Sequence, residues 1–261
     1  MSKNKIIDYC HICLRLRELT FEHIPPRAAF NDRRVITLNF DSAIKLGPDE
    51  FVKGPINQRG SGGHTLCAQC NSYTGRFYGT RFVNWCYEAF YILIKSEGKP
   101  RGIYLRRAYP LEILKQIVSM FLSINPPEFA RANPELVRFV LNKRLKFLPT
   151  KYRFFTYYNL GNKFRFSGIA ARCDLKGDMV VLSEIGYTPF GYVLTLNSSP
   201  PDDRLFEITD FSRFDYDQPR ELTIYPQVLP VHLLFPGDYR SRKQIQEDYI
   251  RNSKKIITPS H

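Results

Sequence analysis

Apolar side chains recur with a helical period in the middle of the chain. Between residues 71 and 96 they return every three or four positions and so share one face of a predicted helix. The positions of this stripe are Tyr78, Phe82, Trp85, Ala89 and Leu93. Gly98 and Pro100 are expected to end the helix. The stripe has the spacing of ordinary core, and no cofactor is assigned to it.

Two more helical patterns follow. In residues 110–125, Pro110 stands where a first helical residue tolerates proline, and Pro126 and Pro127 prevent continuation. The apolar face of this second helix is expected to comprise Leu114, Ile117, Val118, Phe121 and Leu122. Asn133 and Pro134 then open a third helix, as its cap and its first residue.

From about residue 151 the period of the apolar pattern changes. Short β-branched and aromatic runs are separated by turns rich in glycine, asparagine and proline: YRFFTYYNL, KFRFSGIAARC, DMVVLSEIGY, YVLTLN, LFEITDF and LTIYPQVLPVHLL. Such runs predict an antiparallel sheet. The polar tail RSRKQIQEDYIRNSKK is expected to be either a short exposed helix or disordered.

The composition is that of a folded protein. The chain has 261 residues, of which 43% are hydrophobic and 14% aromatic, enough for a sizeable core without disulfide support. No apolar run reaches the length of a membrane span, and the first residues lack the pattern of a signal peptide. We therefore expect a cytoplasmic protein with no membrane partner. The patterns favour the α+β fold class.

Lysine and arginine exceed aspartate and glutamate by 13, and most of this excess lies in the first 150 residues. Such a surface is usual in proteins that bind polyphosphate, but it is also compatible with a solvated surface that has no partner. Charge alone does not separate DNA from RNA or from anionic lipid. In and after the third helix, four basic residues face either phosphate or water: Arg138, Lys143, Arg144 and Lys146.

Four of the six cysteines form two C-x2-C pairs, Cys10 with Cys13 and Cys67 with Cys70. Disulfides are rare in a reducing compartment, and two such pairs are typical of a tetrahedral zinc site. We therefore expect a structural Zn²⁺ held by all four thiolates. The other two, Cys86 on the helical stripe and Cys173 in a predicted strand, are expected to be inert core thiols.

A Glu-His pair stands between the cysteine pairs, in the stretch TFEHIPP, and CAQC is followed at once by asparagine. The succession of C-x2-C, EHIPP and CAQCN resembles the zinc-containing branch of the HNH endonucleases, whose core is a β-hairpin and a helix around a catalytic metal. The resemblance covers Cys10 to about Gly75. It implies that His23 is the general base and that Glu22 and Asn71 are ligands of a catalytic Mg²⁺ or Mn²⁺.

These roles agree with the chemistry of phosphodiester hydrolysis. An imidazole with a pKa of about 6.5 can deprotonate water near neutral pH, and carboxylate and amide oxygens hold a hard divalent cation. In one respect the sequence departs from the family. Many members carry an asparagine about five residues before the third cysteine, where it braces the hairpin and orients the base, and here that position is Gly62. His64, Asn57 or a backbone carbonyl is expected to orient His23 instead.

Between residues 26 and 60 the chain is longer than a tight hairpin requires. Its basic residues either follow the backbone of a duplex or are ordinary loop charges. They are Arg27, Arg33, Arg34, Lys45, Lys53 and Arg59.

The sequence thus predicts a zinc-bound ββα-metal nuclease unit in residues 1–99, followed in residues 100–261 by a helical segment and an antiparallel sheet domain. The resemblance implies a metal-dependent endonuclease that cuts DNA, and such families often act in bacterial and phage defence against foreign DNA. Two alternatives stay open: an enzyme that cuts RNA with the same site, and a non-catalytic, zinc-stapled nucleic-acid-binding module. Residues 151–261 are expected to choose the target, sense a signal or bind a partner protein.

Overall fold

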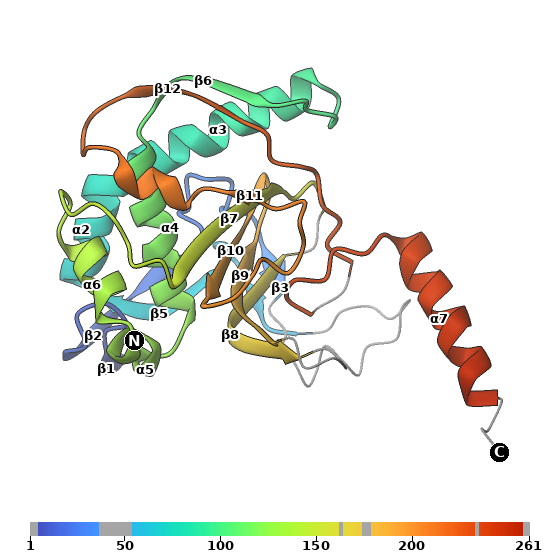
Figure 1. Ribbon diagram of the computed structural model, residues 1–261. Coiled ribbons are helices and arrows are strands. Elements are labelled where there is room, and N and C mark those ends of the chain that lie inside the picture. Colours follow the sequence, from blue (N-terminus) through green and yellow to red (C-terminus); the bar gives the residue numbers. More distant parts are fainter. Residues whose placement is uncertain (1–4, 37–53, 162–163, 174–178, 233–234, 258–261) are drawn as a thin grey trace.

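The computed structural model describes residues 5–36, 54–161, 164–173, 179–232 and 235–257 (Figure 1). Helices and antiparallel strands alternate along this part of the chain, consistent with the predicted α+β class. Lys45 and Lys53 lie outside the described residues.

The N-terminal region forms a three-stranded antiparallel sheet. Its order is β1-β2-β5, built from β1 (Ile7–Tyr9), β2 (Leu16–His23) and β5 (Gly62–Cys67). In the segment between β2 and β5, the short strand β3 (Val35–Ile36) pairs with β4 (Ile56–Asn57). Glu22 and His23 therefore end the strand that lies beside β5.

Directly after β5 the chain enters one helical run made of α2 (Ala68–Thr74), the π-helical turn η1 (Gly75–Gly79) and α3 (Thr80–Lys95). The run begins before the predicted residue 71, because Cys67 is still extended and takes the N-cap position. All five residues of the predicted stripe are buried, as expected. Gly98 ends the run with φ +74°, and its N–H bonds to the carbonyl oxygen of Leu93 at 2.8 Å.

Helix α4 (Pro110–Ile124) lies at the centre of the molecule (Figure 1). It packs against η1, α3, β5, β8 and β9, which surround it. The prediction of this helix is confirmed, but the prediction that only one face of it is buried is wrong. Every residue from Pro110 to Ser123 is buried, including the polar Glu112, Lys115 and Gln116, because α4 has neighbours on all sides.

Two short helices follow α4: α5 (Pro127–Ala132), which was not predicted, and α6 (Pro134–Leu141). Asn133 precedes α6 as predicted, but its side chain does not cap the helix. Its Nδ2 donates to the carbonyl oxygen of Phe129, and its Oδ1 accepts from the hydroxyl of Tyr152.

The C-terminal half contains the predicted antiparallel sheet. Its order is β11-β7-β10-β9-β8, with β7 (Tyr152–Tyr158), β8 (Arg165–Cys173), β9 (Met179–Gly186), β10 (Phe190–Leu196) and β11 (Phe206–Glu207). The last predicted strand is shorter than expected, because Pro226 and Pro230 interrupt it. Its strand β12 (Arg220–Ile224) pairs with β6 (Ile103–Ala108), which the sequence pattern did not predict.

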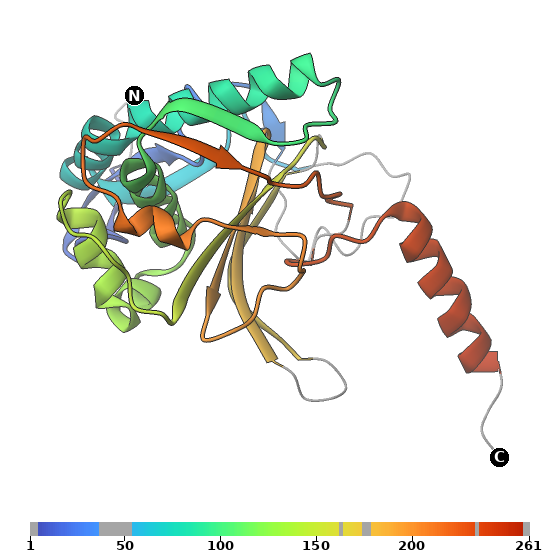
Figure 2. The ribbon, with the colours of Figure 1, turned by 45° about the horizontal axis from the view of Figure 1, so that its top comes forward.

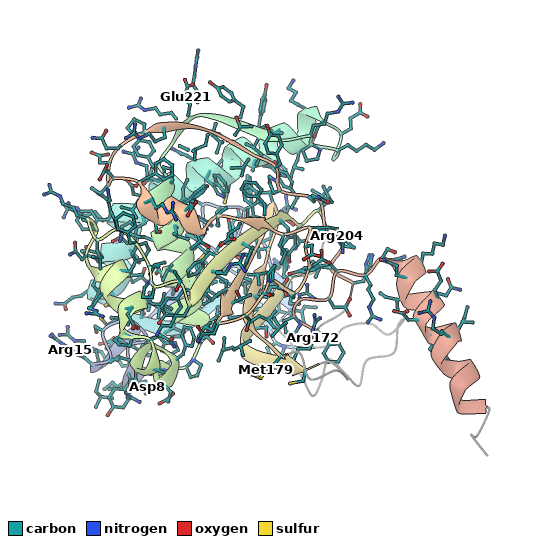
Figure 3. All side chains as sticks on the ribbon, in the orientation of Figure 1. Asp8, Arg15, Arg172, Met179, Arg204 and Glu221 are labelled. Carbon is teal, nitrogen blue, oxygen red and sulfur yellow. The ribbon has the colours of Figure 1, made fainter. Side chains whose placement is uncertain are left out.

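The prediction for Cys173 is wrong, because this thiol is exposed. Cys173 ends β8, an edge strand of the sheet, and the last three residues of this strand are exposed. Figure 3 shows the same end of the β8–β9 pair, where Arg172 and Met179 are labelled. Cys86 is buried, as predicted.

The larger hydrophobic core of the described residues runs through both halves of the chain. It includes Trp85 of α3, Phe121 of α4 and Phe154 of β7, and the ring of Trp85 stacks on that of Phe190 with centroids 4.8 Å apart. The tail forms α7 (Arg242–Ile257), which projects away from this body (Figure 2). Among the described residues, no helix is long and apolar enough to cross a membrane.

Candidate active site

The four paired cysteines meet at one point. Their sulfur atoms lie within 4.8 Å of one another, and the Sγ atoms of Cys13 and Cys67 are 3.9 Å apart. Four thiolates at about 2.3 Å from a tetrahedral Zn²⁺ lie about 3.8 Å from one another. The cluster therefore has the size and the donor atoms to hold a metal ion, and zinc fits this donor set.

The thiols of the cluster differ in acidity. Hydrogen bonds from the Cys70 thiol and from the backbone N–H of Cys67 lower the pKa of Cys10 to about 4. The hydrogen bond with Cys10, together with burial, raises the pKa of Cys70 above its ordinary value. A bound dication would stabilise the thiolate forms of all four cysteines.

The cluster fixes the start of α2 to the small sheet. Cys67 ends β5 and Cys70 lies in α2, whereas the first cysteine pair precedes β2. The backbone N–H of His11 also donates to the carbonyl oxygen of Thr65, and His11 Nδ1 lies 3.0 Å from the carbonyl oxygen of Ser123 in α4. Asn71, the residue after Cys70, is thereby held opposite the end of β2.

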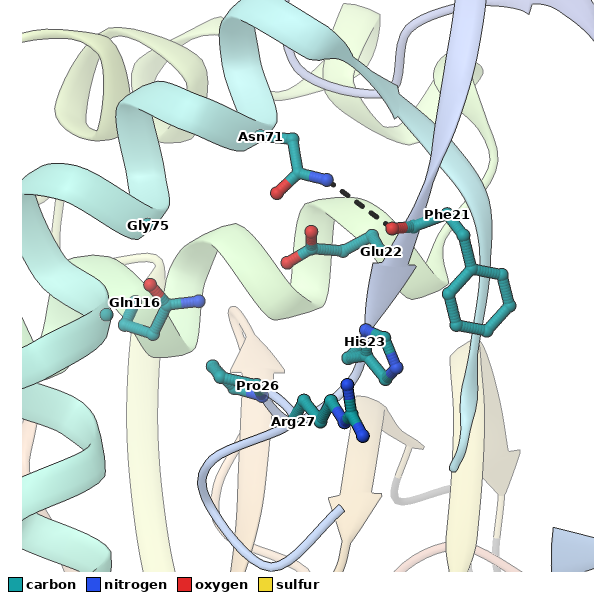
Figure 4. A pocket seen from close by; sticks show the side chains of 9 residues that line it. Phe21, Glu22, His23, Pro26, Arg27, Asn71, Gly75 and Gln116 are labelled. Atoms are coloured by element: carbon teal, nitrogen blue, oxygen red, sulfur yellow. Dashed lines mark hydrogen bonds between the residues drawn. The ribbon is translucent and has the colours of Figure 1, made fainter. Parts of the chain in front are cut away.

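A cavity of about 170 Å³ lies between the end of β2, the α2–η1 run and α4 (Figure 4). The three residues to which the resemblance assigns catalytic roles all line it: Glu22, His23 and Asn71. Its other lining residues include Arg27 from the segment after β2, Gly75 and Gly79 from η1, and Gln116 from α4.

Glu22 places a buried carboxylate in this cavity. Its side chain is 7% exposed and forms no hydrogen bond or ion pair with the described part of the chain, and burial raises its pKa to about 7. An ionised carboxylate without a counter-charge is costly in such surroundings. A cation beside Glu22 would remove that cost.

Asn71 presents an oxygen atom to the same space. Its Nδ2 donates to the hydroxyl of Thr20 at 3.0 Å and lies 3.5 Å from the carbonyl oxygen of Phe21 (Figure 4). Because the nitrogen is turned toward β2, the Oδ1 atom faces the cavity. A carboxylate and an amide oxygen are ligands that Mg²⁺ and Mn²⁺ accept, so Glu22 and Asn71 fit the predicted cation.

The hydrogen bond of His23 defines the tautomer of its ring. Its Nε2 lies 3.1 Å from the carbonyl oxygen of Arg59, which can only accept, so Nε2 carries the proton of the neutral ring and Nδ1 is the basic nitrogen. Burial lowers the pKa of His23, and the charges of Arg27 and Arg59 lower it further, although the Arg59 carbonyl opposes them. The neutral ring is therefore favoured near neutral pH.

A backbone carbonyl is thus the group that orients His23. Asn57 does not contact His23 in this way but helps to fix the backbone of Arg59, because its Oδ1 accepts from the Arg59 N–H at 3.2 Å. His64 is exposed on β5 and does not line the cavity. The ring of Phe21 lies edge-on against both His23, at 5.0 Å, and His64, at 5.5 Å.

The geometry at Gly62 leaves no room for a larger residue. Gly62 pairs with His23 across the hairpin, and a Cβ atom there would lie 2.0 Å from the carbonyl oxygen of Glu22. An asparagine therefore has no room at this position.

Asn31, which no sequence pattern marks, links several segments around the β2–β5 pair. It is fully buried, its Nδ2 donates to the carbonyl oxygen of Pro25 at 2.6 Å, and its Oδ1 accepts from the hydroxyl of Tyr187 at 3.1 Å. It further bonds to the backbone of Ser61, just before β5. The Asn31 side chain thus links three parts of the molecule: the segment after His23, the segment before β5, and the turn after β9 of the large sheet.

The predicted basic residues are divided between solvent and internal contacts. Arg27, Arg33, Arg34 and Arg59 are exposed, as are Arg138 and Arg144. In contrast, the Lys143 ammonium lies over the rings of Phe77 and Tyr216, and Lys146 pairs with Asp215 at 2.8 Å. The exposed arginines are the ones free to meet a phosphate.

Comparison with family models, with curated proteins and with solved structures finds no match to this chain.

Proposed function

We propose that this protein is a metal-dependent endonuclease of the HNH type that hydrolyses phosphodiester bonds in DNA. One observation carries the proposal: Glu22, buried without a partner among the residues that the structure describes, shares a single cavity with Asn71 and His23. The neighbouring tetra-cysteine cluster, which we propose holds structural Zn²⁺, supports it by fixing Asn71 to the hairpin.

The residues of the cavity divide the work of hydrolysis. Nδ1 of His23 takes a proton from the attacking water, whose oxygen bonds to phosphorus while the bond to the leaving oxygen breaks. Glu22 and Asn71 would hold Mg²⁺ or Mn²⁺, and such an ion would neutralise the charge that grows on the phosphate and on the leaving oxygen. Arg27, at the rim of the cavity, offers a further positive charge to the phosphate.

DNA is the proposed substrate because the exposed arginines Arg33, Arg34 and Arg59 lie in the segment that joins β2 to β5 and leads to the cavity. Phosphate contacts of this kind position a duplex without reading its sequence. RNA offers the same phosphodiester, so RNA is the comparison substrate in the test.

The deciding experiment incubates purified protein with supercoiled plasmid, and separately with RNA, in Mg²⁺, Mn²⁺ or EDTA. We expect cleavage of DNA that depends on the divalent ion, and a loss on the order of 100-fold or more in His23→Ala with DNA binding and melting temperature unchanged. His64→Ala tests the other histidine: full activity leaves the Arg59 carbonyl as the orienting group, whereas lost activity assigns that role to His64. A wild type that binds DNA but cuts neither substrate would instead support the non-catalytic binding module.

A further inference from the structure

Two glycines face the cavity from the π-helical turn η1. Gly75 and Gly79 begin and end this turn, and both line the cavity opposite His23 and Pro26. A π-helical turn inside a longer helix is uncommon and often marks a functional site.

Neither glycine is required by the backbone or by packing. Both residues have ordinary right-handed helical angles, with φ −59° and ψ −44° at Gly75 and φ −54° and ψ −49° at Gly79. A Cβ atom added at either position would meet no described atom within 4 Å. Glycine inside a helix is less stable than alanine, so these two positions carry a cost that the fold does not explain.

A second observation points to a ligand at this wall. Gln116 projects into the cavity from α4, its side chain is 1% exposed, and its Oε1 is buried without a hydrogen-bond partner in the described part of the chain (Figure 4). Figure 4 shows the amide nitrogen of Gln116 turned into the cavity, where it can donate to an acceptor oxygen of a ligand.

We propose that the wall formed by Gly75, Gly79 and Gln116 receives the sugar-phosphate backbone of DNA beside the bond that is cut. This inference rests on the proposed function, since Glu22 and Asn71 lie at the adjoining part of the same cavity. The absence of side chains at Gly75 and Gly79 lets a bulky, polar chain approach the helix backbone closely. A volume of about 170 Å³ corresponds to roughly six water molecules, which suits a phosphate group with part of its sugar and not a whole nucleotide with its base.

The test uses Gly75→Ala and Gly79→Ala in the full chain. If the glycines serve ligand binding, alanine should raise the melting temperature, whereas if they are needed for the fold, alanine should lower it. We expect each variant to melt about 2–4 °C higher than the wild type, since alanine favours the helix and the space is open. We expect the same variants to bind a short labelled DNA duplex in EDTA more weakly, and to lose roughly tenfold or more in cleavage. Mn²⁺ binding should stay unchanged.

Asn84→Ala is the matched control, because it places alanine at an exposed position of the same helical run, away from this cavity. It should be stabilised in the same way, with wild-type DNA binding and cleavage.

A lower melting temperature in both glycine variants would show that the glycines are needed for folding. Unchanged DNA binding in the stabilised variants would show that DNA does not contact this wall. Either result overturns the inference. A wild type that binds the duplex without cutting it overturns the proposed function but still lets the binding measurement decide the inference. A wild type that neither binds nor cuts DNA overturns both.

Discussion

The side-chain amide of Asn31 forms two hydrogen bonds with the backbone of Ser61. Its Nδ2 donates to the Ser61 carbonyl oxygen at 2.8 Å, and its Oδ1 accepts from the Ser61 N–H at 2.7 Å. This pair closes the large loop between β2 and β5, so that the segment carrying Arg59 stays beside His23. The Arg59 carbonyl, which bonds to the His23 ring, is thus held in place by a residue far from Arg59 in the loop.

Asn31→Ala should therefore be strongly destabilising. It leaves the carbonyl oxygen of Pro25 and the N–H of Ser61 without their partner, and each such group costs about 1–3 kcal/mol. We expect a loss of at least about 2 kcal/mol in the free energy of unfolding, measured in urea, together with reduced cleavage. Tyr187→Phe removes only one bond of Asn31 and should cost about 1 kcal/mol. An Asn31→Ala protein within about 0.5 kcal/mol of the wild type would contradict this role.

Glu22 should make the stability of the metal-free protein fall as pH rises. Its pKa is about 7 in the folded protein and near the ordinary 4.5 when unfolded, so its contribution is complete below about pH 4.5 and is lost as pH approaches 7. The difference corresponds to about 3 kcal/mol. In EDTA at pH 8, Glu22→Gln should therefore be more stable than the wild type, and the two should converge near pH 4.

Adding Mn²⁺ at pH 8 should reverse that order, because a cation stabilises the ionised Glu22 and gains less from an amide. Glu18→Gln, on the same strand but exposed, is the control and should follow the wild type under both conditions. Equal stabilisation of wild type and Glu22→Gln by Mn²⁺ would place the cation elsewhere.

Elemental analysis should find about one zinc per chain after desalting, since four thiolates close one tetrahedral site. The Cys67→Ala protein should lose both its zinc and its folded structure. Cys86→Ala is the matched comparison, because Cys86 is equally buried but lies outside the cluster: it should keep its zinc whatever it costs in stability. Brief EDTA treatment should stop cleavage reversibly while the zinc and the fold persist. A stable Cys67→Ala protein would contradict the structural role of the cluster.

Arg138 and Arg144 should contribute to DNA binding through phosphate contacts. Reversing both charges, in Arg138→Glu with Arg144→Glu, should weaken duplex binding and lower the slope of log affinity against log salt by about two, with little effect on stability. Lys243→Glu on the projecting α7 is the control and should leave the slope unchanged. Binding that does not depend on salt would favour a protein partner over DNA.

Local signals in the sequence predicted the parts of the fold that depend on local structure. The buried stripe of α3, the proline boundaries of α4 and the runs that form β7 to β10 follow from periodicity and turn residues alone. Strand β6 does not follow from the sequence pattern because two arginines interrupt its apolar run and its partner β12 lies more than a hundred residues further along the chain. Nothing local marks such a pairing.

The candidate site shows the same division. Four cysteines at C-x2-C spacing predict their own cluster, and the cluster in turn explains how Asn71 reaches the end of β2. A glutamine in an apolar helix is a signal that could have pointed to Gln116. The pattern does not single it out, because a helix with one buried face is expected to turn its glutamine toward solvent. Asn31 gave no signal at all: its importance comes from three backbone and side-chain partners that only the folded chain brings together.

Because the core is continuous, the cavity cannot be transplanted by moving residues 1–99 into another protein. Such a graft would carry the cysteines, Glu22, His23 and Asn71, but it would leave behind α4, which packs against β5, η1 and α3 and supplies Gln116. Leu66, Tyr78 and Phe82 belong to this shared core, and in the graft they would lose contacts that now exclude them from solvent. Any recombination that preserves the site has to inherit the central helix and the sheet behind it as one piece.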